Sequence, residues 1–114
     1  MSKITINYIE FSVRNIERSK IFYGDVFGWD FTDFGPDYCE FSDGQMKGGF
    51  EKSEDVHTGG PLVVLYSQNL EDMQEKIVAA GGEISKSLFS FPGGERFQFL
   101  DLDGYELAIW REKE

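Results

Sequence analysis

The sequence predicts an α+β fold of two β-α-β-β-β modules, because one pattern of segments occurs twice along it. Residues 13–17 and 67–71 resemble each other weakly, and each stretch leads into a helix-like run that closes on a glycine. Each half then has an Asp-Gly turn, at 43–44 and at 103–104, followed by a last short apolar segment. Internal similarity of this kind indicates a duplicated supersecondary unit. Equivalent positions of the two halves can therefore be compared with each other.

The length and composition predict one domain that folds by itself. At 114 residues the chain has the size of an ordinary domain, and 40% hydrophobic residues, with 16% aromatics, supply the material for a core. We expect a single domain over residues 1–114, with the first module at 1–52 and the second at 61–114. Residues 51–60 carry charges and glycines without periodicity, which favours a surface connection.

The charge balance excludes two classes of partner. The chain has 11 basic and 21 acidic residues, and its net charge of −10 repels phosphate backbones and anionic headgroups. We therefore expect neither nucleic acid nor a membrane as a partner. The single cysteine, Cys39, permits no intrachain disulfide, and the N-terminus is too short and polar for a secretory signal. These features predict a cytoplasmic protein.

The first module is predicted to begin with a strand over residues 4–13. Alternation divides its side chains between a face packed on a helix, with Ile9, Phe11 and Val13, and an opposite face, with Tyr8, Glu10 and Ser12.

A helix over residues 16–27 is expected next, capped by Asn15 and ended by Gly28. Its predicted buried stripe consists of Ile21, Phe22 and Val26. Strands at 29–34, 37–41 and 46–50 complete the module, because turn residues separate these apolar segments.

The second module repeats this order. A strand at 62–66 leads to a helix that Asn69 caps and the glycines at 81–82 end. Its predicted buried stripe consists of Leu70, Met73, Ile77 and Val78. Strands follow at 84–89, 96–100 and 106–110, with residues 92–94 as the loop between the first two.

Ordinary catalytic motifs are missing from the sequence. His57, the only histidine, falls in the charged connection and is interpreted as a solvated loop residue. Cys39 falls in a short aromatic strand and is interpreted as a small buried hydrophobic residue. No phosphate loop or nucleophile elbow is found, and no catalytic residue is assigned.

Several motifs together resemble the vicinal oxygen chelate superfamily, which includes glyoxalase I, bleomycin-resistance proteins and extradiol dioxygenases. They are residues 17–19 leading to Phe22-Tyr23 and to 27–29, then the glycines at 81–82, and finally 93–94 ahead of 101–105. The resemblance covers nearly the whole chain. It implies that the two modules form a curved, cup-like mixed sheet with a helix packed outside each half, and that a ligand or metal lies inside.

In metal-dependent members of that superfamily, two ligands lie on the leading strands of the modules and two on the closing strands. The resemblance carries these places to Tyr8, Leu62, Gly48 and Ala108. Gly, Ala and Leu have no donor atom, and a neutral tyrosine is a poor ligand for such divalent ions. We therefore expect no metal site and no cofactor, although Glu10 and Glu106 lie two residues from such positions.

The lining of the implied cup gives the candidate ligand-binding residues. Alternation places Tyr8, Glu10, Ser12, Leu62, Val64 and Tyr66 inside from the leading strands, and Met46, Gly48, Phe50, Glu106, Ala108 and Trp110 inside from the closing strands. The predicted site consists of Tyr8, Glu10, Phe50, Tyr66, Glu106 and Trp110. The aromatic rings offer stacking surfaces and the two acids favour a cationic or hydrogen-bond-donating ligand. The alternative role of these rings is to fill the cup or to form a subunit interface.

Three functions remain open from the sequence. The first is a metal-independent protein that binds or sequesters a small molecule, of the glyoxalase and bleomycin-resistance type, and the resemblance implies a homodimer. The second is a metal-dependent lyase, isomerase or dioxygenase that uses non-standard ligands. The third is a degenerate domain with a structural or interaction role.

Overall fold

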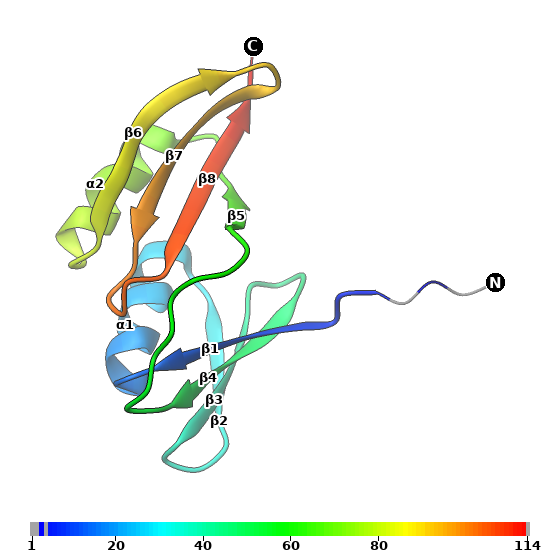
Figure 1. Ribbon diagram of the computed structural model, residues 1–114, viewed down its shortest axis with the longest axis vertical. Helices are drawn as coiled ribbons and strands as arrows, with labels where there is room; N and C mark the ends of the chain where they lie inside the picture. The colour runs from blue at the N-terminus through cyan, green and yellow to red at the C-terminus, as the bar shows by residue number, and fades with distance from the viewer. Residues whose placement is uncertain (1–2, 4, 114) are drawn as a thin grey trace. The chain divides into compact units, whose positions relative to one another are not determined.

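The computed structural model describes residue 3 and residues 5–113, and it divides the chain into two compact units, Met1–His57 and Thr58–Glu114. Each unit contains one helix and one mixed four-stranded sheet (Figure 1). The predicted α+β class, with two β-α-β-β-β modules, is thereby confirmed. Within the described residues, no helix has both the length and the apolar character needed to cross a membrane.

The first unit has the sheet order β1-β4-β3-β2. Its elements are β1 (Tyr8–Val13), α1 (Ile16–Phe27), β2 (Asp30–Asp33), β3 (Tyr38–Ser42) and β4 (Lys47–Lys52). The leading strand β1 runs parallel to the closing strand β4, and the other neighbours are antiparallel. The predicted strand over 4–13 is shorter in the structure, since β1 begins at Tyr8; residue 4 lies outside the described residues.

Local chemistry sets both ends of α1. The Asn15 side chain accepts a hydrogen bond from the Arg18 backbone N–H at 3.0 Å, which satisfies one free donor of the first turn. Gly28 ends the helix in the left-handed region, at φ 73°, where a residue without Cβ is favoured. The predicted bounds of this helix are confirmed.

An aromatic core packs between α1 and the sheet. The Trp29 ring stacks between Tyr23, with centroids 4.8 Å apart, and Phe41, with centroids 4.6 Å apart. Phe50 is fully buried and its ring lies 5.3 Å from Tyr23 and 5.0 Å from Phe41. Cys39 is buried as predicted, and burial is the main cause that raises the pKa of its thiol to about 11.

The second unit has the sheet order β5-β8-β7-β6. Its elements are β5 (Val63–Tyr66), α2 (Leu70–Ala79), β6 (Glu83–Phe91), β7 (Gly94–Leu100) and β8 (Glu106–Glu112). Again the leading strand is parallel to the closing strand, here β5 to β8. Figure 1 shows α2 running beside β6 and β7. Its core contains Leu70, Ile77, Phe97, Phe99, Leu107 and Ile109, all at most 1% exposed.

Two residues of the predicted helix stripes were placed wrongly. Ile21 is 63% exposed and Val78 is 56% exposed, whereas their neighbours Phe22 and Ile77 are buried. Adjacent residues of a helix point about 100° apart, so they do not share a face. The polar Ser19, which is 3% exposed, takes part in the buried face of α1 instead.

Candidate functional site

The strand pairing in the first unit places Tyr8 and Glu10 on the sheet face opposite the aromatic core. Tyr8 pairs with Lys47 and Glu10 pairs with Gly49, and paired residues of neighbouring strands project to the same side. We call this surface the Tyr8 face and define it by Tyr8, Glu10, Tyr38 and Gly49. The predicted orientation of Tyr8 and Glu10, away from the helix, agrees with this register.

Phe50 lies on the other face, so its expected position beside Tyr8 and Glu10 is wrong. It pairs with Phe11 rather than with Glu10, and both rings belong to the buried core. Gly48 pairs with Ile9 and shares that core-facing side. Met46 lies ahead of β4, which begins at Lys47.

A difference between the two Asp turns explains this error of one residue. In the first turn, Asp43 Oδ1 accepts bonds from the backbone N–H groups of Gln45 and Met46. In the second, Asp101 Oδ1 accepts from Asp103 and Tyr105, so the capping aspartate lies two residues ahead of the Asp-Gly pair. Strand β4 begins three residues after Gly44, whereas β8 begins two residues after Gly104. Counting from the Asp-Gly glycine therefore shifts one closing strand against the other.

Strand register identifies Gly49 as the true counterpart of Ala108. Glu10 pairs with Gly49 on the first closing strand, and Val64 pairs with Ala108 on the second. The metal-ligand place that the resemblance put at Gly48 therefore belongs at Gly49. Glycine at either position has no donor atom, so the chemical argument is unchanged.

Three side chains of the Tyr8 face form a hydrogen-bonded chain that the sequence analysis missed. The Tyr38 hydroxyl donates to Glu10 Oε1 at 2.9 Å, and the Tyr8 and Tyr38 hydroxyl oxygens are 2.8 Å apart. Burial, followed by the bonds to Tyr8 and Glu10, raises the pKa of Tyr38 above its ordinary value. Tyr38 alternates with the buried Cys39 in β3, and that alternation was the available sequence signal.

The number of hydroxyl protons fixes which group donates in each of these two hydrogen bonds. A tyrosine hydroxyl has one proton, and Tyr38 uses its proton for Glu10. The Tyr8 hydroxyl must then donate to Tyr38, and its own oxygen retains lone pairs that accept hydrogen bonds. Tyr8 is 37% exposed and lines a pocket of about 500 Å³ together with Ile6, Asn7, Glu40, Gln45, Met46 and Lys47. The Tyr8 face therefore offers an acceptor to whatever enters this pocket.

Gly49 leaves room for the two tyrosine hydroxyls. A Cβ built at Gly49 would contact the Tyr38 hydroxyl and lie 2.8 Å from the Tyr8 hydroxyl. The hydroxyls thus fill the space into which a side chain at this family ligand position would project.

We expect Gly49→Ala to displace Tyr38 and break its bond to Glu10. The effect of Gly49→Ala on the free energy of unfolding should shrink in a Tyr38→Ala background, with a coupling of about 1 kcal/mol. Urea unfolding of the two single variants and the double variant measures this coupling. Additive effects would contradict the proposed contact.

Aromatic side chains gather on one face of the second sheet. Tyr66 pairs with Trp110 across β5 and β8, and their rings meet edge to face with centroids 5.3 Å apart. The ring centroids of Phe91 and Trp110 are 6.3 Å apart. Arg96 pairs with Trp110 across β7 and β8, so it projects from the same face. We call this surface the Trp110 face and define it by Tyr66, Phe89, Phe91, Arg96, Gln98, Glu106, Ala108, Trp110 and Glu112.

Glu106 also lies on the Trp110 face, four residues along β8 from Trp110. Its Oε2 accepts hydrogen bonds from Ser85 Oγ at 2.7 Å and from Gln98 Nε2 at 3.0 Å. The bond from Ser85, followed by that from Gln98, lowers the pKa of Glu106 below its ordinary value. This carboxylate therefore stays ionised at neutral pH without a bonded cation.

The donor chemistry at the four family positions does not fit a divalent ion. Leu62, Ala108 and Gly49 carry no donor atom, and the neutral hydroxyl of Tyr8 is a poor ligand for such ions. Within residues 3 and 5–113, no group of three or more His, Cys, Asp or Glu side chains is arranged to hold a metal. His57 is exposed, in the connection where it was predicted, and its Nε2 lies 3.2 Å from Asp55 Oδ1.

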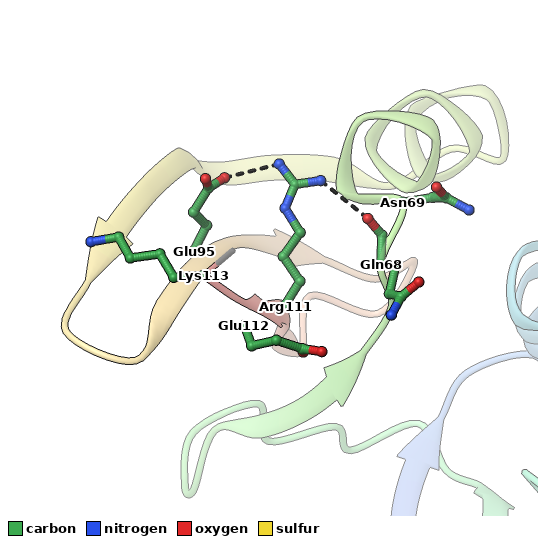
Figure 2. A pocket seen from close by; sticks show the side chains of 6 residues that line it. All are labelled: Gln68, Asn69, Glu95, Arg111, Glu112 and Lys113. Atoms are coloured by element: carbon green, nitrogen blue, oxygen red, sulfur yellow. Dashed lines mark hydrogen bonds and ion pairs between the residues drawn. The ribbon is translucent and has the colours of Figure 1, made fainter.

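A separate polar pocket of about 560 Å³ lies at the end of β8, and the sequence analysis did not predict it. It is lined by Gln68, Asn69, Glu95, Arg111, Glu112 and Lys113 (Figure 2). Arg111 binds Glu71 with two bonds of 2.9 and 3.0 Å, Glu95 at 2.9 Å and the Gln68 carbonyl at 3.1 Å. Since two carboxylates already neutralise Arg111, we assign this residue a structural role: its bonds to the Gln68 carbonyl and to Glu71 connect β8 to the start of α2.

Comparison with known proteins gives one family model and many similar structures. Residues 5–109 match the model of the Glyoxalase/Bleomycin resistance protein/Dioxygenase superfamily. None of the curated protein sequences matches the chain.

Three solved structures illustrate the similarity. A glyoxalase-related enzyme from Fulvimarina pelagi is 22% identical, with 93% of this chain and 86% of that chain covered and a TM-score of 0.81. A glyoxalase/bleomycin resistance protein/dioxygenase family enzyme from Burkholderia phytofirmans is 16% identical, with 94% and 98% covered and a TM-score of 0.85. The E126Q mutant of the fosfomycin resistance protein FosX from Listeria monocytogenes, complexed with Mn(II) and 1S,2S-dihydroxypropylphosphonic acid, is 14% identical, with 98% and 93% covered and a TM-score of 0.84.

Proposed function

Since the chain belongs to the Glyoxalase/Bleomycin resistance protein/Dioxygenase superfamily, we propose that it binds or sequesters a small molecule without the divalent ion of its metal-dependent relatives. The observation that carries this proposal is the set of residues at the family ligand positions, where Gly49, Leu62 and Ala108 offer no donor atom. Each unit offers its own candidate contacts: Tyr8 and Glu10 on the Tyr8 face of the first unit, and Tyr66, Glu106 and Trp110 on the Trp110 face of the second. Phe50 is excluded because it is fully buried in the core.

The Trp110 face has the composition of a small-molecule site. Apolar rings with a few polar groups among them are typical of such sites, and the rings supply stacking area while the polar groups set orientation. Tyr66 is 49% exposed and Val64 is 46% exposed, so this part of the sheet is open to solvent. The polar pocket at Arg111 is a weaker candidate, since its central cation is already neutralised.

The proposal includes a homodimer in the cytoplasm, as the resemblance to small members of the superfamily implies. Light scattering of the purified protein measures the oligomeric state. A monomer at micromolar concentration would remove the homodimer from the proposal and leave the ligand site in place.

Binding is tested on purified protein with a thermal-shift screen of small molecules and with native mass spectrometry for a co-purified ligand. We expect Trp110→Ala to weaken the binding of a hit by about tenfold or more, because it removes the central ring of the Trp110 face. The matched control is Phe34→Ala, which truncates an aromatic residue that is 60% exposed and lies outside all strands. Equal weakening by both variants, or no ligand from either method, would contradict the proposal.

The metal-dependent alternative is decided by a second measurement. We expect elemental analysis to find less than about one tenth of an equivalent of nickel, manganese, iron or zinc, and no specific thermal stabilisation by these ions. FosX protein, whose solved structure contains Mn(II), serves as the positive control for metal binding. Stoichiometric metal with stabilisation would favour the lyase, isomerase or dioxygenase class over simple binding.

A further inference from the structure

We propose that Arg96 makes the Trp110 face a receptor for a flat aromatic anion, such as an aryl carboxylate. This inference rests on the proposed binding function and names the class of ligand for that face. It starts from the position of Arg96 in β7, where it pairs with Phe89 of β6 on one side and with Trp110 of β8 on the other. The cation therefore projects from the same sheet face as these two rings.

Aromatic rings cover part of the Arg96 side chain. Its Cζ lies 5.3 Å from the centre of the Phe89 ring and 5.9 Å from the centre of the Phe91 ring. Its Nε is buried and has no hydrogen-bond partner. A guanidinium is weakly hydrated and tolerates contact with aromatic rings, so these rings hold the group in place without neutralising its charge.

No carboxylate neutralises Arg96 among the residues that the structure describes. Its guanidinium has neither an ion pair nor a hydrogen bond there, although acidic residues outnumber basic ones by 21 to 11. Arg111, in the same unit, shows the usual outcome in this acidic chain, with Glu71 and Glu95 bound to its guanidinium. The Arg96 Nη groups also lack a partner but, unlike Nε, are not buried. They are thus available to a ligand.

The available donors favour an anion with a planar pair of oxygens. A guanidinium presents parallel N–H groups that match a carboxylate, and the charge-assisted bonds are stronger than neutral ones. Trp110 and Phe91, whose centroids are 6.3 Å apart, lie beside the cation and offer surface for an aryl group. A ligand with an aromatic ring next to its carboxylate would use both features at once.

The net charge of −10 repels anions in general, but this repulsion acts over a short distance. At physiological salt the Debye length is about 8 Å, so distant surface carboxylates are largely screened. Two acids lie on this face, on either side of Arg96. Glu112 pairs with Gly94, two residues along β7 from Arg96, and its carboxylate is hydrogen-bonded to the Tyr66 side chain. Glu106 pairs with Leu100, four residues along β7 in the other direction, which is about 13 Å of strand. These carboxylates disfavour an anion at the two ends of the face, so the anionic group of the ligand is held at Arg96 between them.

Three probes of the same shape test the charge preference. They are 2-naphthoate, the neutral 2-naphthamide and the cationic 2-naphthylmethylammonium, and calorimetry measures their binding to the full chain. We expect naphthoate to bind at least about tenfold more tightly than the amide, and more weakly as salt rises. Equal affinities for the three probes, or tightest binding of the cation, would overturn the inference.

Variants of Arg96 assign the effect to this side chain. Arg96→Gln should remove the advantage of naphthoate over the amide, and Arg96→Lys should keep part of it because the charge remains while the fork is lost. Lys113→Gln makes the same change in net charge at an exposed position and should have no effect. Thermal unfolding of each variant confirms its fold. If Arg96→Gln kept the full advantage, Arg96 would not be the receptor.

The outcomes separate this inference from the proposed function. If all three probes bound equally and Trp110→Ala abolished their binding, the binding function would stand and the anion preference would fall. If none of the probes bound and the small-molecule screen also gave no ligand, the proposed function itself would fail together with this inference.

Discussion

Truncating Phe50 to alanine is expected to lower the free energy of unfolding by about 3–5 kcal/mol, the usual cost of removing a buried phenylalanine ring. The side chain is fully buried, and its ring lies within 5.3 Å of the Tyr23 and Phe41 rings, centre to centre. Its loss would leave a cavity that strands β3 and β4 cannot close without distorting their pairing. Urea unfolding followed by circular dichroism measures the effect.

Phe34→Ala is the control for this prediction. Phe34 is 60% exposed, so the same truncation there should change stability by less than about 1 kcal/mol. The comparison also decides between the two placements of Phe50. A variant Phe50→Ala with unchanged stability but lost ligand binding would place the ring in the ligand site, as the sequence alone suggested, and would contradict the register of β1 and β4.

The fold class was predictable because its signals are local. Asn15 and Gly28 delimit α1 through a capping bond and a left-handed backbone, and both depend only on neighbouring residues. The repeat of the strand–helix order in the second half depends on the same kind of signal. Helix α2 lacks a side-chain bond at its N-cap, Asn69, yet it begins where the pattern predicted.

Strand register was less predictable because it depends on long-range pairing. Strand β4 begins three residues after the glycine of its Asp-Gly turn, whereas β8 begins two residues after the corresponding glycine, so the same count shifts one closing strand against the other. A shift of one residue exchanges the two faces of a strand. This placed Phe50 with Tyr8 and Glu10 in the sequence analysis, whereas the faces of β1, β5 and β8, including Tyr66 and Trp110, followed from alternation alone.

Alternation in β3 was a signal for the face of Tyr38, but neither its hydrogen bonds nor the absence of a carboxylate at Arg96 had a signal in the sequence. Tyr38 matters because its hydroxyl meets Tyr8 and Glu10, which lie on another strand. Arg96 matters because the described residues provide it with no carboxylate, and an acidic composition predicts the opposite. Both properties come from tertiary contacts. In contrast, the register error does not affect the conclusion that the family ligand positions lack a metal-binding atom, because Gly48 and Gly49 are both glycines.

Gly48→Ala is expected to cost about 3 kcal/mol of unfolding free energy, at the upper end for an added methyl group in a packed core. A Cβ at Gly48 would collide with the Ile9 carbonyl oxygen and with the Phe41 ring. The carbonyl belongs to the neighbouring strand β1, so relief requires β1 and β4 to move apart, and the parallel pairing between them would weaken. Thermal and urea unfolding measure the loss.

Two other glycines make this prediction specific to the core face. Gly59→Ala should leave stability almost unchanged, because a Cβ there has no neighbour within 4 Å. Gly49→Ala lies next in sequence but meets the Tyr38 side chain, whose hydroxyl end can swing aside, rather than backbone. We therefore expect the order of loss Gly48→Ala, then Gly49→Ala, then Gly59→Ala. A larger loss for Gly49→Ala than for Gly48→Ala would mean that β4 presents its faces in the opposite sense, with Gly49 toward the core and Gly48 beside Tyr8.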